Sequence, residues 1–395
     1  MACTLAVQAQ RPATRTASPT AKSTATTPWP DAVAQRLDAL MADSLLETAQ
    51  LGMMVWDLTT DQPLYQRNHR QLMRTASTMK AFTAIAALDR LGGDYRVRTS
   101  LYYTGEITDS VFSGQLYCQG GMDPLFSQAD IEAFAHSVRQ MGVKAAAIDI
   151  VLDNSMKDTL RWGEGWCWDD NNPTLTPLLY NGRDTFKDHL VMALQADSID
   201  LITVTLLRDT VPQDAQLLCQ RTHTIDELLQ PMMKDSHNLT AECLYYQLAA
   251  ATGRHPATAA DAQRVEQELL KKMGLDGGAY RLADGSGLSL YNYLSPECLT
   301  LLMRYAFQHP DIYRHLLPSL PVAGKDGTLE KRMRRTPAQG RVQAKTGTVA
   351  AVSTLTGYIT APNGHRLCFA IMMQGLRRVV DGRRLQDALC VALCQ

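Results

Sequence analysis

The sequence predicts an α/β protein of the α+β type, in which helices flank an antiparallel sheet and a smaller domain interrupts the chain. Two hairpin patterns, at 51–67 and 352–373, supply the strands of this sheet. Apolar residues recur at helical spacing near both ends, at 31–48 and 382–393. Between residues 95 and 219 the pattern changes to short strands and loops, which indicates an inserted domain.

The first predicted helix runs over 31–48, and its apolar face is formed by Val33, Leu37, Leu40, Met41 and Leu45. A strand at 51–58, a turn at 59–63 and a return strand at 64–67 follow it. Together these strands form the first hairpin of the sheet.

The next helix covers the apolar run 81–91 and ends at Gly92-Gly93, since glycine is a common helix stop. The inserted segment has one clear helix, at 128–141, and a further helix follows at 239–249. The helical stretches therefore lie on either side of the sheet in the predicted assembly.

The second hairpin consists of strands at 352–360 and 365–373 around a turn at 362–364, and a closing helix at 382–393 ends the chain. Pairing the two hairpins gives one antiparallel sheet with helices on both faces. The predicted domain bounds are a disordered tether at 1–27, a main domain at 28–94 and 220–395, and an inserted domain at 95–219.

The overall composition excludes several functional classes. At 395 residues the chain suits two or three domains, and its formal net charge of −1 argues against nucleic-acid binding and electrostatic membrane attachment. No apolar stretch approaches the ~20 residues that span a bilayer. Nine cysteines lack the spacing of a disulfide scaffold or a zinc site, and no H-E-x-x-H motif occurs, so we expect free thiols and no metal.

The N-terminus suggests export. Residues 1–10 have neither a basic start nor a full apolar core, so they are not an intact signal peptide. Val7-Gln8-Ala9 nevertheless resembles the small-residue pattern before a cleavage site, and the next ~20 residues are basic, free of acids and rich in Thr, Ala, Ser and Pro. We expect a periplasmic or extracytoplasmic protein whose recorded chain starts inside an export signal.

Ser77-Thr78-Met79-Lys80 is the most informative motif. A spacing of three residues places the Ser77 hydroxyl and the Lys80 amine on one helix face. A nearby base can activate a serine, and lysine can be that base if burial or a positive charge lowers its pKa. The motif alone is a weak signal, because this pair occurs by chance on many helices.

Two later motifs strengthen the interpretation. Ser236-His237-Asn238 precedes a helix, and Lys345-Thr346-Gly347-Thr348 precedes a strand. The order S-x-x-K, S-x-N, K-T-G is the signature set of penicillin-binding proteins and serine β-lactamases. We expect Ser236 to relay a proton towards the leaving nitrogen, and Asn238 to bind the substrate amide or hold Lys80.

The K-T-G motif adds groups for an anionic substrate. Lys345 would lower the pKa of Lys80 and attract a carboxylate, with Thr346 and Thr348 adding hydroxyls. Gly347 would let the strand backbone approach the substrate. The backbone N–H groups of Ser77 and Thr348 are candidates for the oxyanion hole. These residue types together indicate acyl transfer through a serine ester.

The chain resembles the low-molecular-mass class C penicillin-binding proteins, which are D-alanyl-D-alanine carboxypeptidases and endopeptidases. Besides the three motifs, the resemblance includes the runs Gly120–Pro124, Asp284–Ser289, Ser319–Gly324 and Asp326–Leu329. It implies a β-lactamase/transpeptidase-like fold and a cofactor-free serine peptidase. The implied substrates are peptidoglycan stem peptides, and β-lactam antibiotics are the implied covalent inhibitors.

Several alternatives stay open at this stage. One is a serine β-lactamase or esterase with the same motifs, and another is a catalytically silent peptidoglycan-binding module. The preference for carboxypeptidase or endopeptidase action is also open. His237 stands where the family usually has aspartate, so it either adds a titration near pH 6–7 or points away from the site.

Two further expectations concern the inserted segment. It is shorter than in family members with two inserted domains, so we expect one inserted domain. Trp162, Trp166 and Trp168, followed by two aspartates, form either a polymer-binding surface or a packing loop.

Overall fold

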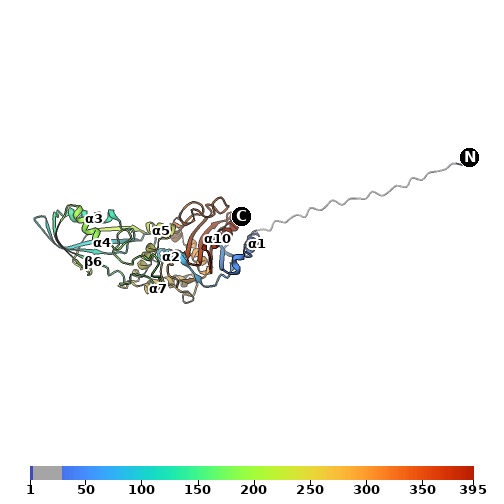
Figure 1. The fold of residues 1–395 in the computed structure, drawn as a ribbon, viewed down its shortest axis with the longest axis horizontal. Coiled ribbons are helices and arrows are strands. Elements are labelled where there is room, and N and C mark those ends of the chain that lie inside the picture. Colours follow the sequence, from blue (N-terminus) through green and yellow to red (C-terminus); the bar gives the residue numbers. More distant parts are fainter. Residues whose placement is uncertain (3–28) are drawn as a thin grey trace.

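The computed structural model describes residues 1–2 and 29–395, so most of the predicted tether lies outside the described residues. Two five-stranded sheets lie towards opposite ends of an elongated molecule, with a group of helices between them (Figure 1). The C-terminus lies near the first sheet, at the end of α10 (Val379–Leu393), and α1 (Asp31–Leu40) packs beside α10 (Figure 1).

The first sheet contains both predicted hairpins and is antiparallel throughout, which confirms the predicted fold class. Its strand order is β10-β11-β12-β1-β2. The strands are β1 (Gln50–Asp57), β2 (Gln62–Arg67), β10 (Val342–Val349), β11 (Val352–Thr360) and β12 (Arg366–Gln374). Strand β10, which carries the K-T-G motif, is an edge strand and pairs only with β11 among these strands.

Helices cover both faces of this sheet, and β12 shows why. Its alternate residues Leu367, Phe369 and Ile371 enter a core shared with α1 and α10. Cys368 and Ala370 enter the opposite core. Because successive side chains of a strand point to opposite faces, a continuous apolar run is required when both faces are buried.

The opposite core is formed mostly by helices. These are α2 (Met79–Leu91), α5 (Ile225–Lys234), α6 (Asn238–Ala250), α7 (Ala259–Lys272), α8 (Pro296–Gln308) and α9 (Pro310–Ser319). The predicted helices at 81–91 and 239–249 correspond to α2 and α6. No helix among residues 1–2 and 29–395 has both the length and the apolar character needed to cross a bilayer.

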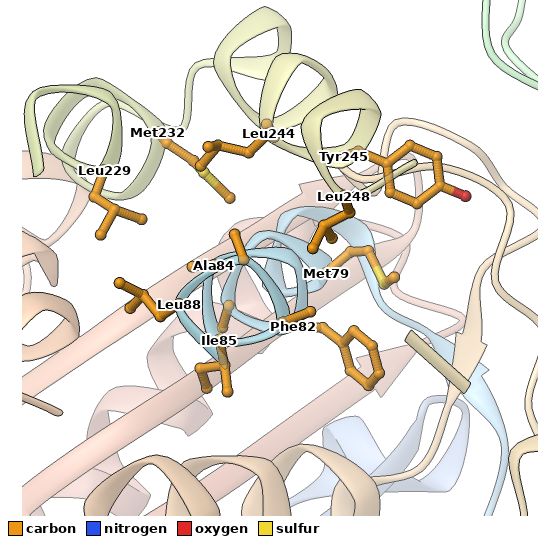
Figure 2. Close-up of a cluster of buried hydrophobic side chains, with 14 of the residues drawn as sticks. Met79, Phe82, Ala84, Ile85, Leu88, Leu229, Met232, Leu244, Tyr245 and Leu248 are labelled. Atoms are coloured by element: carbon orange, nitrogen blue, oxygen red, sulfur yellow. The ribbon is translucent and has the colours of Figure 1, made fainter. Parts of the chain in front are cut away.

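Helix α2 is the centre of this core. Ala84 and Leu88 of α2 face apolar side chains of α5 and α6, while Phe82 and Ile85 project from other sides of the helix (Figure 2). Every residue from Met79 to Leu88 is buried. The helix that follows the S-x-x-K serine is therefore held on all sides, which fixes the position of its first turn.

The predicted helix at 31–48 is wrong in its second half. Helix α1 ends at Leu40, and a separate 3₁₀ turn covers Ser44–Glu47. The Asp43 side chain accepts a hydrogen bond from Leu45 N at 2.8 Å. An aspartate in this capping position competes with the continuation of a helix, which explains the break.

The second sheet lies within the predicted insertion and has the order β7-β6-β5-β4-β8. Its strands are β4 (Arg96–Thr108), β5 (Val111–Gln119), β6 (Ala145–Asp153), β7 (Asp200–Leu207) and β8 (Gln216–Thr224). The β5–β6 and β6–β7 pairs are parallel, and α3 (Gln128–Gln140) and α4 (Phe186–Ala196) lie on the two connections. Both helices contribute to a third core.

The expectation of short strands and one helix in this segment was incomplete. Strand β4 spans 13 residues, and α4 is a second helix. Helix α4 has no side-chain cap at its start, and the outer half of β4 is mostly exposed and polar, so neither gives a clear signal in the sequence. The predicted domain bounds remain a prediction, and β8 runs past the bound placed at 219/220.

Candidate active site

Ser77 lies in a 3₁₀ turn, Ala76–Thr78, immediately before α2. This turn packs against β10 and β11 of the first sheet. Thr354 Oγ1 of β11 donates a hydrogen bond to Thr75 O at 2.7 Å and lies 3.2 Å from Thr78 Oγ1. The hydroxyl of Ser77 is thus carried by a turn that is bound both to a buried helix and to a strand.

Lys80 is fully buried, and its side chain points to the serine. Its Nζ lies 2.9 Å from Ser77 Oγ, 2.7 Å from Asn238 Oδ1 and 2.7 Å from the backbone oxygen of Ser286. Burial lowers the pKa of Lys80 to about 8, although the negative charges of Asp284 and Glu242 act in the opposite direction. The amine is therefore within hydrogen-bond distance of Ser77 Oγ, and its lowered pKa makes exchange of a proton with this hydroxyl easier.

The S-x-N motif forms the connection between α5 and α6. Ser236 has a positive φ of 61°, and Asn238 is the first residue of α6. Of the two roles expected for Asn238, the contact in the structure is the one to Lys80. Asn238 and Ser77 therefore both contact the same amine.

His237 contacts its own helix. Its Nδ1 lies 2.7 Å from Thr240 Oγ1. Partial loss of water contact and the charge of Lys80 lower the pKa of His237 below its usual value. Of the two readings of this residue, titration in the pH range of catalysis is the less favoured, because a lowered pKa keeps the ring neutral at pH 7.

Lys345 is the second buried amine of the site. Its Nζ lies 2.8 Å from Ser236 Oγ and 2.8 Å from Thr346 O. Burial and the charge of Lys80 hold the pKa of Lys345 well below its usual value. We expected Lys345 to be the cause of the lowered pKa of Lys80, whereas burial is the main cause for both amines.

Gly347 has a role inside the protein, and its expected close approach to a substrate stays a prediction. A Cβ at this position would lie 2.1 Å from Thr354 Oγ1 and 2.9 Å from both Thr75 O and Thr78 N. The absence of a side chain lets β10 lie against the turn that carries Ser77. Glycine at this position therefore permits a close approach between the strand and the turn that contains Ser77.

The two threonines of the K-T-G-T run have polar partners at the surface. Thr346 Oγ1 donates to Thr328 Oγ1 at 2.8 Å, and the Arg383 guanidinium donates to Thr348 Oγ1 at 3.1 Å. Arg383 lies on α10 and was not predicted from the sequence, because nothing local marks it among the neighbouring arginines. Its guanidinium places a positive charge beside the Thr348 hydroxyl.

The sequence analysis also missed the groups that support Lys80. Ser286 belongs to the D-G-S-G-L-S run, whose backbone oxygen contacts the amine, and Glu242 of α6 accepts hydrogen bonds from this run. A signal was present, because Glu242 is the one acidic residue in the otherwise apolar or uncharged α6. A lone buried charge usually has a specific partner.

The three tryptophans of the tryptophan-rich segment differ in burial. Trp166 is buried, and its Nε1 donates to Asp284 Oδ2 at 2.8 Å, so this residue packs against the active-site loop. Trp162 and Trp168 are 51% and 83% exposed. The packing interpretation is correct for Trp166, and a polymer-binding surface stays a prediction for the other two. No group of three or more His, Cys, Asp or Glu side chains in residues 29–395 is arranged to hold a metal ion.

A serine hydroxyl next to a buried lysine, on an antiparallel sheet flanked by helices, defines a serine peptidase of the penicillin-recognising type. The chain belongs to the D-Ala-D-Ala carboxypeptidase 3 (S13) family, whose model matches residues 33–179 and 178–395. This confirms the resemblance drawn from the motifs, and the chain is therefore a serine-type hydrolase.

Individual relatives agree with this assignment. A D-alanyl-D-alanine carboxypeptidase of Actinomadura sp. (strain R39) is 28% identical, with 91% of this chain and 84% of the relative covered. The carboxypeptidase DacB of Haemophilus influenzae is 25% identical, with 85% and 87% covered. The crystal structure of penicillin-binding protein 4 from H. influenzae has a TM-score of 0.81 at 22% identity, covers 89% of this chain and 97% of its own, and shows the same fold.

Proposed function

We propose that Ser77 is the nucleophile of this D-Ala-D-Ala carboxypeptidase and that Lys80 is the base that activates it. The observation that carries the proposal is the 2.9 Å contact between Ser77 Oγ and the buried Nζ of Lys80. A neutral amine at this distance can accept the hydroxyl proton as the oxygen attacks a carbonyl carbon. Burial supports the role, because it favours the neutral form of lysine.

The reaction then proceeds in two halves. Ser77 Oγ adds to the carbonyl carbon of the penultimate D-Ala, while its proton passes to Lys80. The C–N bond breaks, and the departing amine of the last D-Ala takes up the proton that Lys80 accepted, with the Ser236 hydroxyl, which contacts Lys345, as the relay, so that Lys80 is neutral again. Water then attacks the ester, its proton passes to Lys80 and on to the departing Ser77 Oγ, and the shortened peptide is released with Ser77 restored.

The substrate's terminal carboxylate would lie at the exposed hydroxyls of Thr346 and Thr348. Arg383 adds a positive charge beside Thr348, and Lys345, which contacts Thr346 O, adds a second one in its protonated form. Charge-assisted hydrogen bonds to a carboxylate are about twice as strong as neutral ones. The backbone N–H groups of Ser77 and Thr348 are the candidates for holding the developing oxyanion. This arrangement suits a peptide that ends one residue after the scissile bond.

Peptidoglycan stem peptides are the proposed substrates, with cross-links as a further possibility for the same chemistry. Such substrates lie outside the cytoplasm, so we place the protein in an extracytoplasmic compartment. β-Lactams are proposed to acylate the same serine, because their strained amide resembles the D-Ala-D-Ala bond. The H. influenzae protein with the same fold has a structure in complex with a β-lactam.

Incubation with benzylpenicillin, followed by intact-mass and peptide-mapping mass spectrometry over time, tests the proposal. A stable adduct on Ser77, absent from Ser77→Ala, is the expected result. A transient adduct with turnover of penicillin would favour the β-lactamase alternative. A folded protein that forms no adduct would favour the silent peptidoglycan-binding module.

Lys80 is tested separately in the same assay. Lys80→Ala should slow acylation by about 10²–10⁴-fold, which is the usual contribution of a positioned base. Acylation of this variant at the parental rate would exclude Lys80 as the base, while leaving Ser77 as the nucleophile.

A further inference from the structure

The loop 284–289 is built around a buried carboxylate. Asp284 accepts hydrogen bonds at 2.7 to 2.8 Å from Gly287 N, Ser289 N, Asn292 Nδ2 and Trp166 Nε1. These bonds close the loop on itself and fix it to the tryptophan-rich segment. The result is a rigid turn whose Ser286 backbone oxygen faces Lys80.

A second buried carboxyl, that of Glu242, accepts hydrogen bonds from backbone amides of the same loop. Its Oε1 accepts from Ser286 N at 2.8 Å and its Oε2 accepts from Gly285 N at 3.4 Å. Glu242 lies one helical turn after Asn238 on α6, so both residues share one face of the helix. Asn238 contacts Lys80 directly, and Glu242 contacts it through the backbone of Ser286.

We infer that Glu242 is a positioning residue for Lys80: by binding the amides of Gly285 and Ser286, it places the Ser286 carbonyl where it orients the amine towards Ser77. The inference rests on the proposed role of Lys80 as the base. A lysine side chain has four rotatable bonds, and two fixed acceptors besides the serine leave its amine little freedom. Misplacement of a reacting group by about 1 Å can cost 10²-fold in rate.

The charges of Asp284, Glu242 and Lys80 also affect one another's pKa values. Burial, with the charge of Asp284, raises the pKa of Glu242 to about 8. In return, the negative charges of Asp284 and Glu242 raise the pKa of Lys80 against the effect of its burial. The other titratable groups that face this cluster are Glu266 of α7, Lys345 of β10, His237 before α6, and Tyr245, Tyr246 and Cys243 of α6.

The sign of the effect on pH dependence follows directly. Near pH 8, where Lys80 loses its proton, a Glu242 carboxyl with a pKa of about 8 is about half ionised, and its negative charge stabilises the Lys80 ammonium. A neutral glutamine at position 242 never carries this charge. The pKa of Lys80 should therefore be lower in Glu242→Gln, and the acid limb of the acylation rate should move to lower pH. Glutamine keeps one carbonyl oxygen for Ser286 N, so the rate at the plateau should remain within about threefold of the parent.

Glu266→Gln is the matched control. Glu266 is buried in the same cluster, but its carboxyl contacts Thr83 at 3.4 Å and no amide of the loop. Burial and neighbouring negative charges hold the pKa of Glu266 well above its usual value, and the negative charges that act on Lys80 are those of Asp284 and Glu242. Replacement by neutral glutamine should leave the acid limb where it is in the parent.

The experiment measures the second-order rate of acylation by a fluorescent penicillin from pH 5.5 to 9.5 for the parent, Glu242→Gln and Glu266→Gln. Glu242→Ala, which removes both acceptors, should acylate about 10–100-fold more slowly at the plateau. A shift in Glu242→Gln with no shift in Glu266→Gln supports the inference. Identical acid limbs in all three proteins overturn it.

Two outcomes separate this inference from the proposed function. If the parent forms no adduct on Ser77, the proposed function fails and the inference fails with it. If the parent is labelled on Ser77 but Glu242→Gln keeps the parental pH profile, only the inference fails. Glu242→Ala is compared only if its circular dichroism matches the parent, and the glutamine variant decides the question otherwise.

Discussion

The amine of Lys80 has no contact with solvent, and three protein oxygens surround it in place of water. This environment satisfies the hydrogen bonds of the ammonium group, and burial still lowers the pKa of Lys80. With a pKa of about 8, about one molecule in ten carries a neutral Lys80 at pH 7. Part of the Lys80 population is therefore neutral at pH 7, and the three oxygen contacts still orient the amine.

The pH dependence of acylation should reflect this amine. Because only neutral Lys80 can accept the proton of Ser77, the acylation rate at low penicillin concentration should rise with pH and level off above about pH 8. Stopped-flow measurement of penicillin acylation across pH 5.5–9.5 gives the profile. A rate that is constant between pH 6 and 9 would contradict the assignment of Lys80.

Arg383 should determine the affinity for a free carboxylate. Arg383→Gln removes the positive charge beside Thr348 and should raise KM for a D-Ala-D-Ala peptide about tenfold, equivalent to ~1.4 kcal/mol. The same peptide with a terminal carboxamide should show no such change. Arg384→Gln, at the neighbouring exposed position of α10, serves as the control, and an equal effect of both variants would indicate general electrostatics only.

At the scale of elements, the active site depends on the contact between the 284–289 loop and the turn that carries Ser77. Gly287 has a φ of +76°, and a Cβ there would lie 1.8 Å from Ala76 O. No side chain fits in that distance, so glycine is required for steric as well as conformational reasons. The 284–289 loop is thus in direct contact with both α6 and the turn that contains Ser77.

Gly287→Ala should move the Ser77 turn and lower both stability and labelling. We expect a loss of more than ~1 kcal/mol in the free energy of unfolding and a clear fall in the penicillin acylation rate. Gly253→Ala is the matched control, because Gly253 has a φ of +77° and nothing within 4 Å of the added Cβ. Urea unfolding and penicillin labelling should separate the two, and equal losses would show that the steric contact is unimportant.

The sequence predicted those parts of the site that rest on local spacing. The Ser77–Lys80 pair followed from a separation of three residues on a helix, and every strand of the first sheet except β10 followed from a hairpin pattern. The contact of Lys80 with Ser286 joins residues 206 positions apart, and no periodicity encodes such a contact. The break after Leu40 was missed because one capping side chain, Asp43, outweighed a regular apolar pattern.

At the scale of the whole molecule, buried polar contacts connect the second sheet's segment to the core of the first. Gln247 of α6 donates to Gly121 O at 2.6 Å and accepts from Tyr95 OH at 2.7 Å. Trp166 adds the bond to Asp284 described above. The helix that supplies Asn238 and Glu242 to the site therefore also anchors the inserted segment.

Gln247→Ala should destabilise the protein by ~1–3 kcal/mol, because it leaves the Gly121 carbonyl without its buried partner. Gln267→Ala, at an exposed position of α7, should change the free energy of unfolding by less than ~0.5 kcal/mol. Chemical denaturation of both variants measures the difference. A loss in Gln247→Ala no larger than in the control would mean that this contact does not stabilise the junction.

The alternation along β12 has a consequence for the register of the first sheet. A slip of one residue would send Phe369 and Ile371 into the space now filled by Cys368 and Ala370, so both cores would be wrongly filled at once. The same slip propagated to β10 would turn Lys345 away from Ser236. Misregistered forms of the sheet are therefore destabilised, because both cores would be filled wrongly. In the correctly folded sheet, the Lys345 amine lies on the side of Ser77.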